Sequence, residues 1–158
     1  MRCLLTALGL LLFVSVPVSS NEKKADKIAF EVYARYFVKN TVKLPENPAF
    51  FVFQDKKSFD ETFGIGFVMG KKPKLVNDKL FESNLIVTAI KSGNTPWAYE
   101  VEDVRVEKKQ LIVLYKATGK ESSAKYTAAL IVSLPRGEFT EVVFIENGKE
   151  AGKLAVKK

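Results

Sequence analysis

Residues 97–119 read "WAYEVEDVRVEKKQLIVLYKATG" and consist of two alternating apolar and polar runs. The runs are joined by Lys108 and Lys109. Alternation with a period of two, in a stretch rich in β-branched and aromatic residues, is typical of half-buried β-strands. The stretch therefore predicts a β-hairpin with the two lysines at its tip.

The apolar residues of the first run change face partway along it. Tyr99 and Val101 share one face, whereas beyond Asp103 the apolar positions are Val104 and Val106. A slip of one residue in the phase of a strand is what a β-bulge produces. We expect a bulge near Asp103.

The stretches around this hairpin also predict strands. "NLIVTAI" at 84–90 is apolar at nearly every position, as expected of a strand that is buried on both faces. Residues 123–134 and 139–146 predict two further strands, and Asn147-Gly148 is a strong signal for a hairpin leading into a lysine-bearing edge strand at 149–158. The regular spacing predicts an antiparallel meander after residue 84.

The first half of the chain is more varied. Residues 28–40 predict a strand, with a helix as the alternative, and residues 49–54 predict a short apolar strand. A short helix should begin at Asp55 or Ser58, either of which can accept a backbone N–H, and end at Gly64. The glycine-containing stretch that follows predicts a loop, because its spacing matches no phosphate-binding motif.

These elements predict a mainly β (α+β) fold, a small antiparallel β-sandwich or half-open barrel with one short helix. The domain organisation that we expect is a signal peptide at 1–20, a disordered lead-in at 21–27 and a single β-rich domain at 28–158.

The signal peptide is predicted from one positive residue, Arg2, an apolar run at 4–16 and small residues before a cut after Ser20. The apolar run is too short for a transmembrane helix, so we expect no stable membrane insertion. Its cysteine, Cys3, precedes the run and would leave with it. An exported chain without cysteine suits the bacterial envelope, so the predicted location is periplasmic or secreted.

The residue types that are missing restrict the chemistry. The chain contains no histidine and one cysteine, Cys3. Catalysis by Ser-His-Asp or Cys-His groups is therefore excluded, as are zinc sites built from these ligands. We expect no enzymatic activity, no cofactor and no metal.

Three weaker chemical alternatives remain. Glu100 and Glu102 share a strand face and would suit a carboxylate-dependent hydrolase, although a solvated sheet face also explains them. "SSAK" at 122–125 matches the spacing of a Ser-Lys nucleophile but lies before a β-rich run instead of at a helix start. Oxygen ligands for calcium are sparse, at Asn77-Asp78 and Asp60-Glu61.

Trp97 is the only tryptophan and follows Pro96 in "SGNTPWAY". One interpretation is a core residue that shares a face with Tyr99; the other is a recognition residue held by a rigid loop. If the second holds, a partner surface would join Pro96, Trp97 and Tyr99 to nearby lysines. These lysines are Lys71, Lys72 and Lys74.

The order of elements resembles a known family. "FVFQDKKSFDETFG", "NLIVTAIKSG" and "AYEVEDVRVEKKQLIVLYKATG" together are similar to the C-terminal domain of PrcB-type accessory subunits of protease complexes. The chain is also similar to uncharacterised exported proteins of Gram-negative anaerobes that carry "YFVKN". The resemblance covers about 36–146 and implies an exported β domain without catalysis that assists or restrains a protease. Members usually carry a glycine pair where this chain has "NTPWAY".

The leading hypothesis is thus a non-enzymatic exported accessory module that binds a protein partner. A small hydrolase is one alternative, and an envelope protein that binds anionic glycans is the other, since the net charge is +7. The basic residues are spread along the chain without the aromatic interleaving of a nucleic-acid binder, so we expect no nucleic-acid partner.

Overall fold

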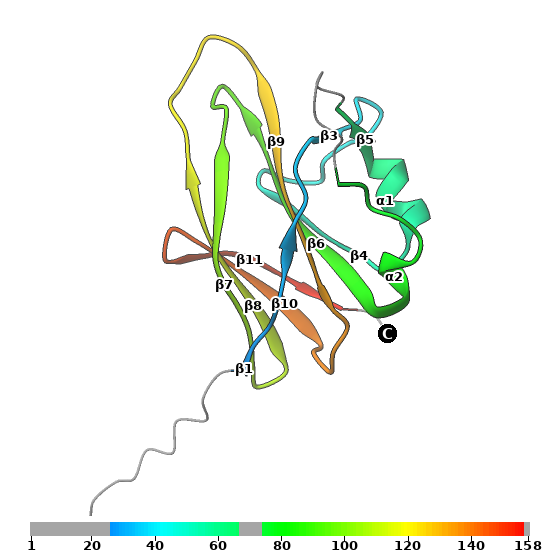
Figure 1. Ribbon diagram of the computed structural model, residues 1–158. Helices are drawn as coiled ribbons and strands as arrows, with labels where there is room; N and C mark the ends of the chain where they lie inside the picture. The colour runs from blue at the N-terminus through cyan, green and yellow to red at the C-terminus, as the bar shows by residue number, and fades with distance from the viewer. Residues whose placement is uncertain (1–25, 67–73, 157–158) are drawn as a thin grey trace, which may run out of the picture.

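The structure is a computed structural model (Figure 1) that describes residues 26–66 and 74–156. Two β-sheets pack face to face, and helices with a short two-stranded sheet cover the outer face of one of them. The fold is a small, mostly β sandwich whose sheets are not closed into a barrel, which confirms the predicted fold class. Two helices are present in the described ranges, where we expected one.

Sheet A has five strands in the order β1-β7-β8-β10-β11. Its strands are β1 (Asp26–Lys27), β7 (Ala98–Glu107), β8 (Gln110–Thr118), β10 (Glu141–Glu146) and β11 (Lys149–Ala155). The position of β11 at the end of this order confirms the predicted edge strand.

Sheet B has four strands in the order β2-β9-β6-β4. Its strands are β2 (Glu31–Val32), β9 (Tyr126–Pro135), β6 (Asn84–Gly93) and β4 (Ala49–Phe53). The third layer consists of β3 (Tyr36–Val38), β5 (Phe63–Ile65), α1 (Lys56–Thr62) and α2 (Leu80–Ser83).

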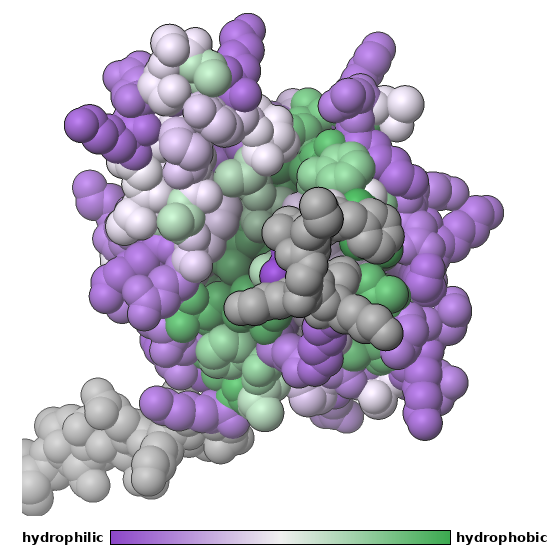
Figure 2. All heavy atoms as spheres, turned by 45° about the horizontal axis from the view of Figure 1, so that its top comes forward, coloured by the Kyte–Doolittle hydropathy of each residue, from purple (hydrophilic) through white to green (hydrophobic). Residues whose placement is uncertain are grey.

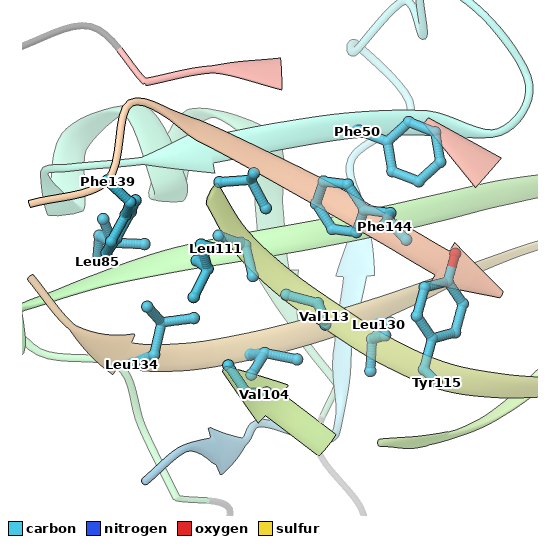
Figure 3. Packing of buried hydrophobic residues seen from close by; sticks show 14 of the residues in the cluster. Phe50, Leu85, Val104, Leu111, Val113, Tyr115, Leu130, Leu134, Phe139 and Phe144 are labelled. Carbon is cyan, nitrogen blue, oxygen red and sulfur yellow. The ribbon is translucent and has the colours of Figure 1, made fainter. Parts of the chain in front are cut away.

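Strand β6 is the centre of the fold because it is buried on both faces, as its apolar sequence predicts. Leu85, Val87 and Ala89 belong to the core between the two sheets, and Ile86 and Ile90 belong to the core beneath the third layer. Figure 3 shows the first of these cores, in which the rings of Phe50 and Phe144 stack with centroids 4.5 Å apart.

The first helix shows how one residue sets a boundary. Asp55 is its N-cap, and the Asp55 side chain accepts a hydrogen bond of 2.8 Å from the Ser58 N–H. Phe59 of this helix is fully buried in the core between the third layer and sheet B. The expected end at Gly64 is wrong, because the helix stops at Thr62 and Gly64 lies in β5.

The predicted turns and bulge are confirmed. Lys108 and Lys109 form the β7–β8 turn with φ of 48° and 67°. Asn147 has a φ of 50° in the β10–β11 turn, where Gly148 supplies the second positive φ. The register between β7 and β8 shifts between Val101 and Asp103, at the place where the apolar phase changes.

The predicted meander is wrong. Strands β7 and β8 form a hairpin in sheet A, but β9 crosses to sheet B, and β10 returns to lie parallel to β8. Parallel strands cannot be joined by a tight hairpin and need a longer crossover connection, which is usually a helix. Here a strand of the facing sheet makes the crossover, so the spacing of strands along the chain does not reveal their partners.

The single strand predicted for 28–40 is also wrong. This stretch contains two short strands, β2 in sheet B and β3 in the two-stranded sheet, and Arg35 turns the chain between them with a φ of 69°. The expected disordered lead-in overlaps strand β1, which pairs with β7 at Arg105 and Val106. The rest of that lead-in and the predicted signal peptide lie outside the described residues. In the described part of the chain, no helix is long and apolar enough to cross a bilayer.

Candidate functional site: a polar and aromatic cluster at one end of the sandwich

One end of the core between the sheets is closed by five side chains, which we call the end cluster. They are Lys91, Trp97, Tyr99, Tyr115 and Glu146. The cluster draws on β6 of sheet B and on β7, β8, β10 and the loop before β7. It therefore lies where both sheets end together.

An ion pair between the sheets forms the middle of the end cluster. Lys91 follows Leu85, Val87 and Ala89 on the face of β6 that is turned toward sheet A, and its Nζ donates to Glu146 on β10. Both side chains are only 15% exposed. Partial burial strengthens the attraction between two charges but requires that both stay paired.

Two tyrosines complete the inner side of the cluster. The Tyr115 hydroxyl donates to Glu146 Oε2 at 3.1 Å, and the Tyr99 ring meets the Tyr115 ring edge-on at 5.9 Å. Burial raises the pKa of both hydroxyls, and the charge of Glu146 raises both further. Both tyrosines are therefore neutral at physiological pH. Figure 3 shows Tyr115 at one end of the buried cluster.

Trp97 occupies the outer side of the cluster. Its ring is half-buried against the core, and Lys91 Nζ lies 4.2 Å from the ring centroid, a cation–π geometry. The loop that carries it packs on Gly119, where an added Cβ would lie 2.4 Å from a Thr95 methyl carbon. Trp97 therefore packs against the core with one part of its side chain and exposes another part to solvent.

A hollow of about 470 Å³ opens beside the ion pair. Its walls include Lys91 and Glu146, with Pro48 on one side and Lys149 and Glu150 on the β10–β11 hairpin. Both signs of charge line it, so it favours a polar group that can both donate and accept hydrogen bonds. The end cluster and this hollow are the candidate site.

The predicted site residues fall in two places. Pro96 is exposed beside Trp97, and Tyr99 is half-buried with its ring in the end cluster. Lys74 is exposed and lies elsewhere, paired with Glu31 on β2. Lys71 and Lys72 lie outside the described residues.

Sequence reasoning missed Lys91 and Glu146. A signal was present for Lys91, since it is a charged residue in phase with the inward apolar positions of β6. Glu146 carried the same signal after Val142 and Phe144. Such a position predicts a buried partner.

The weaker chemical candidates have other contacts. Glu102 pairs with Lys116 at 2.6 Å on the outer face of sheet A, where both are exposed. Ser122 Oγ lies 3.3 Å from the Tyr126 hydroxyl. Within 26–66 and 74–156, no group of three or more acidic, histidine or cysteine side chains is arranged to hold a metal ion.

Comparison with protein-family models, with curated proteins and with solved structures finds no match to this chain.

Proposed function

We propose that the chain is an exported, non-enzymatic accessory module that binds a protein partner through the end cluster. The proposal rests on one observation above the others, the half-buried position of Trp97 under the Lys91 ammonium group. Tryptophan and tyrosine are among the residue types that most often anchor protein interfaces.

The immediate surroundings of Trp97 support this role. Pro96 restricts the backbone of an exposed loop, so little conformational entropy is lost when a partner orders it. The ion pair beneath Trp97 is held by both sheets, which gives the aromatic ring a rigid base. Loops on a rigid β scaffold are common positions for recognition.

The chemistry available at the cluster favours contact over catalysis. Tyr99 and Tyr115 keep their protons because burial raises the pKa of each. Glu146 is engaged by Lys91 and Tyr115, so its carboxylate is already satisfied. Export and an association with a protease follow from the predicted signal peptide and the family resemblance, and they belong to the same proposal.

The test is affinity capture from an envelope extract with the immobilised chain, followed by reconstitution with each purified captured protein. We expect Pro96→Glu, which adds a charge to the exposed loop, to weaken the reconstituted complex at least tenfold. Lys153→Gln on β11 lowers the net charge by the same one unit at an exposed position away from the end cluster and should leave affinity unchanged. Equal affinity in both variants would contradict the proposed surface.

A further inference from the structure

The edge of sheet B opposite β2 is formed by β4, residues Ala49–Phe53. Strand β4 pairs with β6 on one side. A strand at the edge of a sheet presents unpaired N–H and C=O groups on its other side. Which groups these are follows from contacts at the start of the strand.

The Asn47 side chain fixes the direction in which the backbone groups of β6 point. Its Nδ2 donates to the Ser92 carbonyl at 2.7 Å, and its Oδ1 accepts from the Ser92 N–H at 3.0 Å. Both backbone groups of Ser92 therefore point toward the β4 side. Because these groups alternate along a strand, those of Ile90 and Thr88 point the same way.

The same alternation identifies the free groups of β4. Phe51 lies opposite Thr88 and so exchanges hydrogen bonds with it. The N–H and C=O groups of Phe50 and Val52 must then point away from β6. In the described residues, no hydrogen bond is recorded to these outward groups.

A slot of about 420 Å³ lies beside this edge, between β4 and the end of β11. Val52, Leu154 and Val156 supply apolar walls, and Asp55 and Ser58 at the start of α1 supply a polar end. The slot can accept a side chain of the size of valine or leucine from a strand laid along β4.

The two neighbouring edge strands differ in their protection. Strand β11 carries Lys149 and Lys153, and its pairing with β10 is irregular at Ile145. Lysines and bulges are devices that prevent an edge from pairing with another chain. Residues 49–53 read "AFFVF" and carry neither charge nor proline, so nothing in the strand opposes pairing.

We infer that β4 is a strand-addition site for an extended, uncharged segment of a separate protein, with apolar side chains at alternate positions. The incoming backbone exchanges hydrogen bonds with Phe50 and Val52, and one of its apolar side chains enters the slot. Affinity then comes from the main chain and selectivity from the slot.

A second copy of this chain fits the edge less well than an extended segment does. The slot is walled by β11 on one side and by the first turn of α1 on the other, so the edge is recessed. The β4 strand of another copy would be recessed in the same way. Its Phe50 ring also packs on Gly152 and Phe144 and is not available to enter a slot.

This site is separate from the end cluster, so its failure and the failure of the proposed function are distinguishable. Variants at Pro96 address one surface, and variants at Val52 address the other. The probe is a synthetic peptide in which threonine and valine alternate, with a lysine at each end for solubility. Its comparator has the same side chains but is N-methylated at every residue, which removes its hydrogen-bond donors.

We expect saturable binding of the unmethylated peptide to the whole chain, at least tenfold weaker for the N-methylated peptide. Hydrogen exchange should slow at the Phe50 and Val52 amides when the peptide binds, and Phe51 should not change. Val52→Pro removes one outward N–H and should abolish binding. Val52→Thr keeps that N–H and the side-chain volume and should retain it.

Either of two experiments could overturn the inference. In the peptide comparison, equal binding of the methylated and unmethylated peptides would do so, and so would the absence of saturable binding by either. This comparison uses the unaltered chain and does not depend on the folding of Val52→Pro. The second experiment is sedimentation of the chain. If the chain is a dimer that Val52→Pro dissociates, and the peptide does not bind, the β4 edge belongs to an interface with a second copy.

Discussion

Lys91 of sheet B and Glu146 of sheet A form an ion pair that joins the two sheets at the end of their shared core, with each side chain 15% exposed. Each residue ends a row of inward apolar side chains, so the pair takes the place that a further apolar contact would fill. It also connects the buried Tyr115 hydroxyl to the exposed part of Trp97.

The ion pair should show strong coupling between its partners. Lys91→Met or Glu146→Gln alone leaves one partly buried group without its partner and should lower the free energy of unfolding by about 3 kcal/mol. The double variant removes both charges and keeps an acceptor for the Tyr115 hydroxyl, so it should recover most of this loss. Urea denaturation measures all three; strictly additive losses would show that the two residues do not interact.

Gly152 should tolerate no side chain while Phe50 keeps its position. A Cβ at Gly152 would lie 2.5 Å from a ring carbon of Phe50, which stacks on Phe144. Gly152→Ala should therefore destabilise the fold by about 1 to 3 kcal/mol. In a Phe50→Leu background the same change should cost much less. Thermal unfolding of the unaltered chain, the two single variants and the double variant tests this. An equal loss of stability from Gly152→Ala in both backgrounds would contradict the close packing.

Asp55 should make stability depend on pH in the acid range. Hydrogen bonds from the backbone and side chain of Ser58 lower the pKa of Asp55. The contribution of the ionised Asp55 side chain to the free energy of unfolding is present above about pH 3.9, the pKa of an aspartate in the unfolded chain. This contribution is lost as the pH falls through the lower pKa that Asp55 has in the folded protein. Asp55→Asn keeps the cap and removes the titration. The stability difference between the two proteins should therefore change below pH about 4; a constant difference would contradict the cap.

Three tyrosines should ionise late. Burial and the hydrogen bond to Glu31 raise the pKa of Tyr33 to about 12, and burial also raises the pKa values of Tyr99 and Tyr115. Each of these tyrosines has a higher pKa in the folded protein than in the unfolded chain. The stability that the protonated hydroxyls contribute is therefore present below pH about 10, and it is lost as the pH rises through the pKa values of the folded protein. Absorbance titration at constant ionic strength should show tyrosine ionisation continuing above about pH 10, and Tyr115→Phe should reduce the amplitude of this part of the titration. A single transition near pH 10 would contradict the burial of all three.

The strands that can be found from sequence are those whose own residues determine them. The β7–β8 hairpin, its bulge near Asp103 and the turn at Asn147 each follow from local alternation or from residues that accept positive φ. The parallel pairing of β8 with β10 depends instead on β9 joining the other sheet. The local sequence pattern of β9 does not indicate which sheet it joins.

The break in the first predicted strand has a similar cause. Alternation over 28–38 is compatible with one long strand, yet the chain turns at Arg35 and supplies β2 to sheet B and β3 to the two-stranded sheet. The tertiary contacts that drive this are remote in sequence; for example, the Tyr33 N–H donates to the Ile131 carbonyl. The local sequence pattern therefore predicts here that the residues are extended, but it does not predict how long each strand is.

The candidate site was predictable in part. Pro96, Trp97 and Tyr99 are recognisable because of their residue types and neighbours. Lys91 and Glu146 come together only when two strands from different sheets face each other, and the sequence separates them by 55 positions. A charged residue in phase with a buried apolar row is a usable signal for each, but it does not identify the partner.

Fluorescence of Trp97, the only tryptophan, tests most directly whether the end cluster is a binding surface. The measurement is a titration of the chain with a purified captured partner that lacks tryptophan or has it replaced. We expect a saturable shift of the Trp97 emission, and the same complex should require at least tenfold more partner in Pro96→Glu. Saturable binding by another readout with no change in Trp97 emission, and with equal affinity in Pro96→Glu, would contradict the proposal.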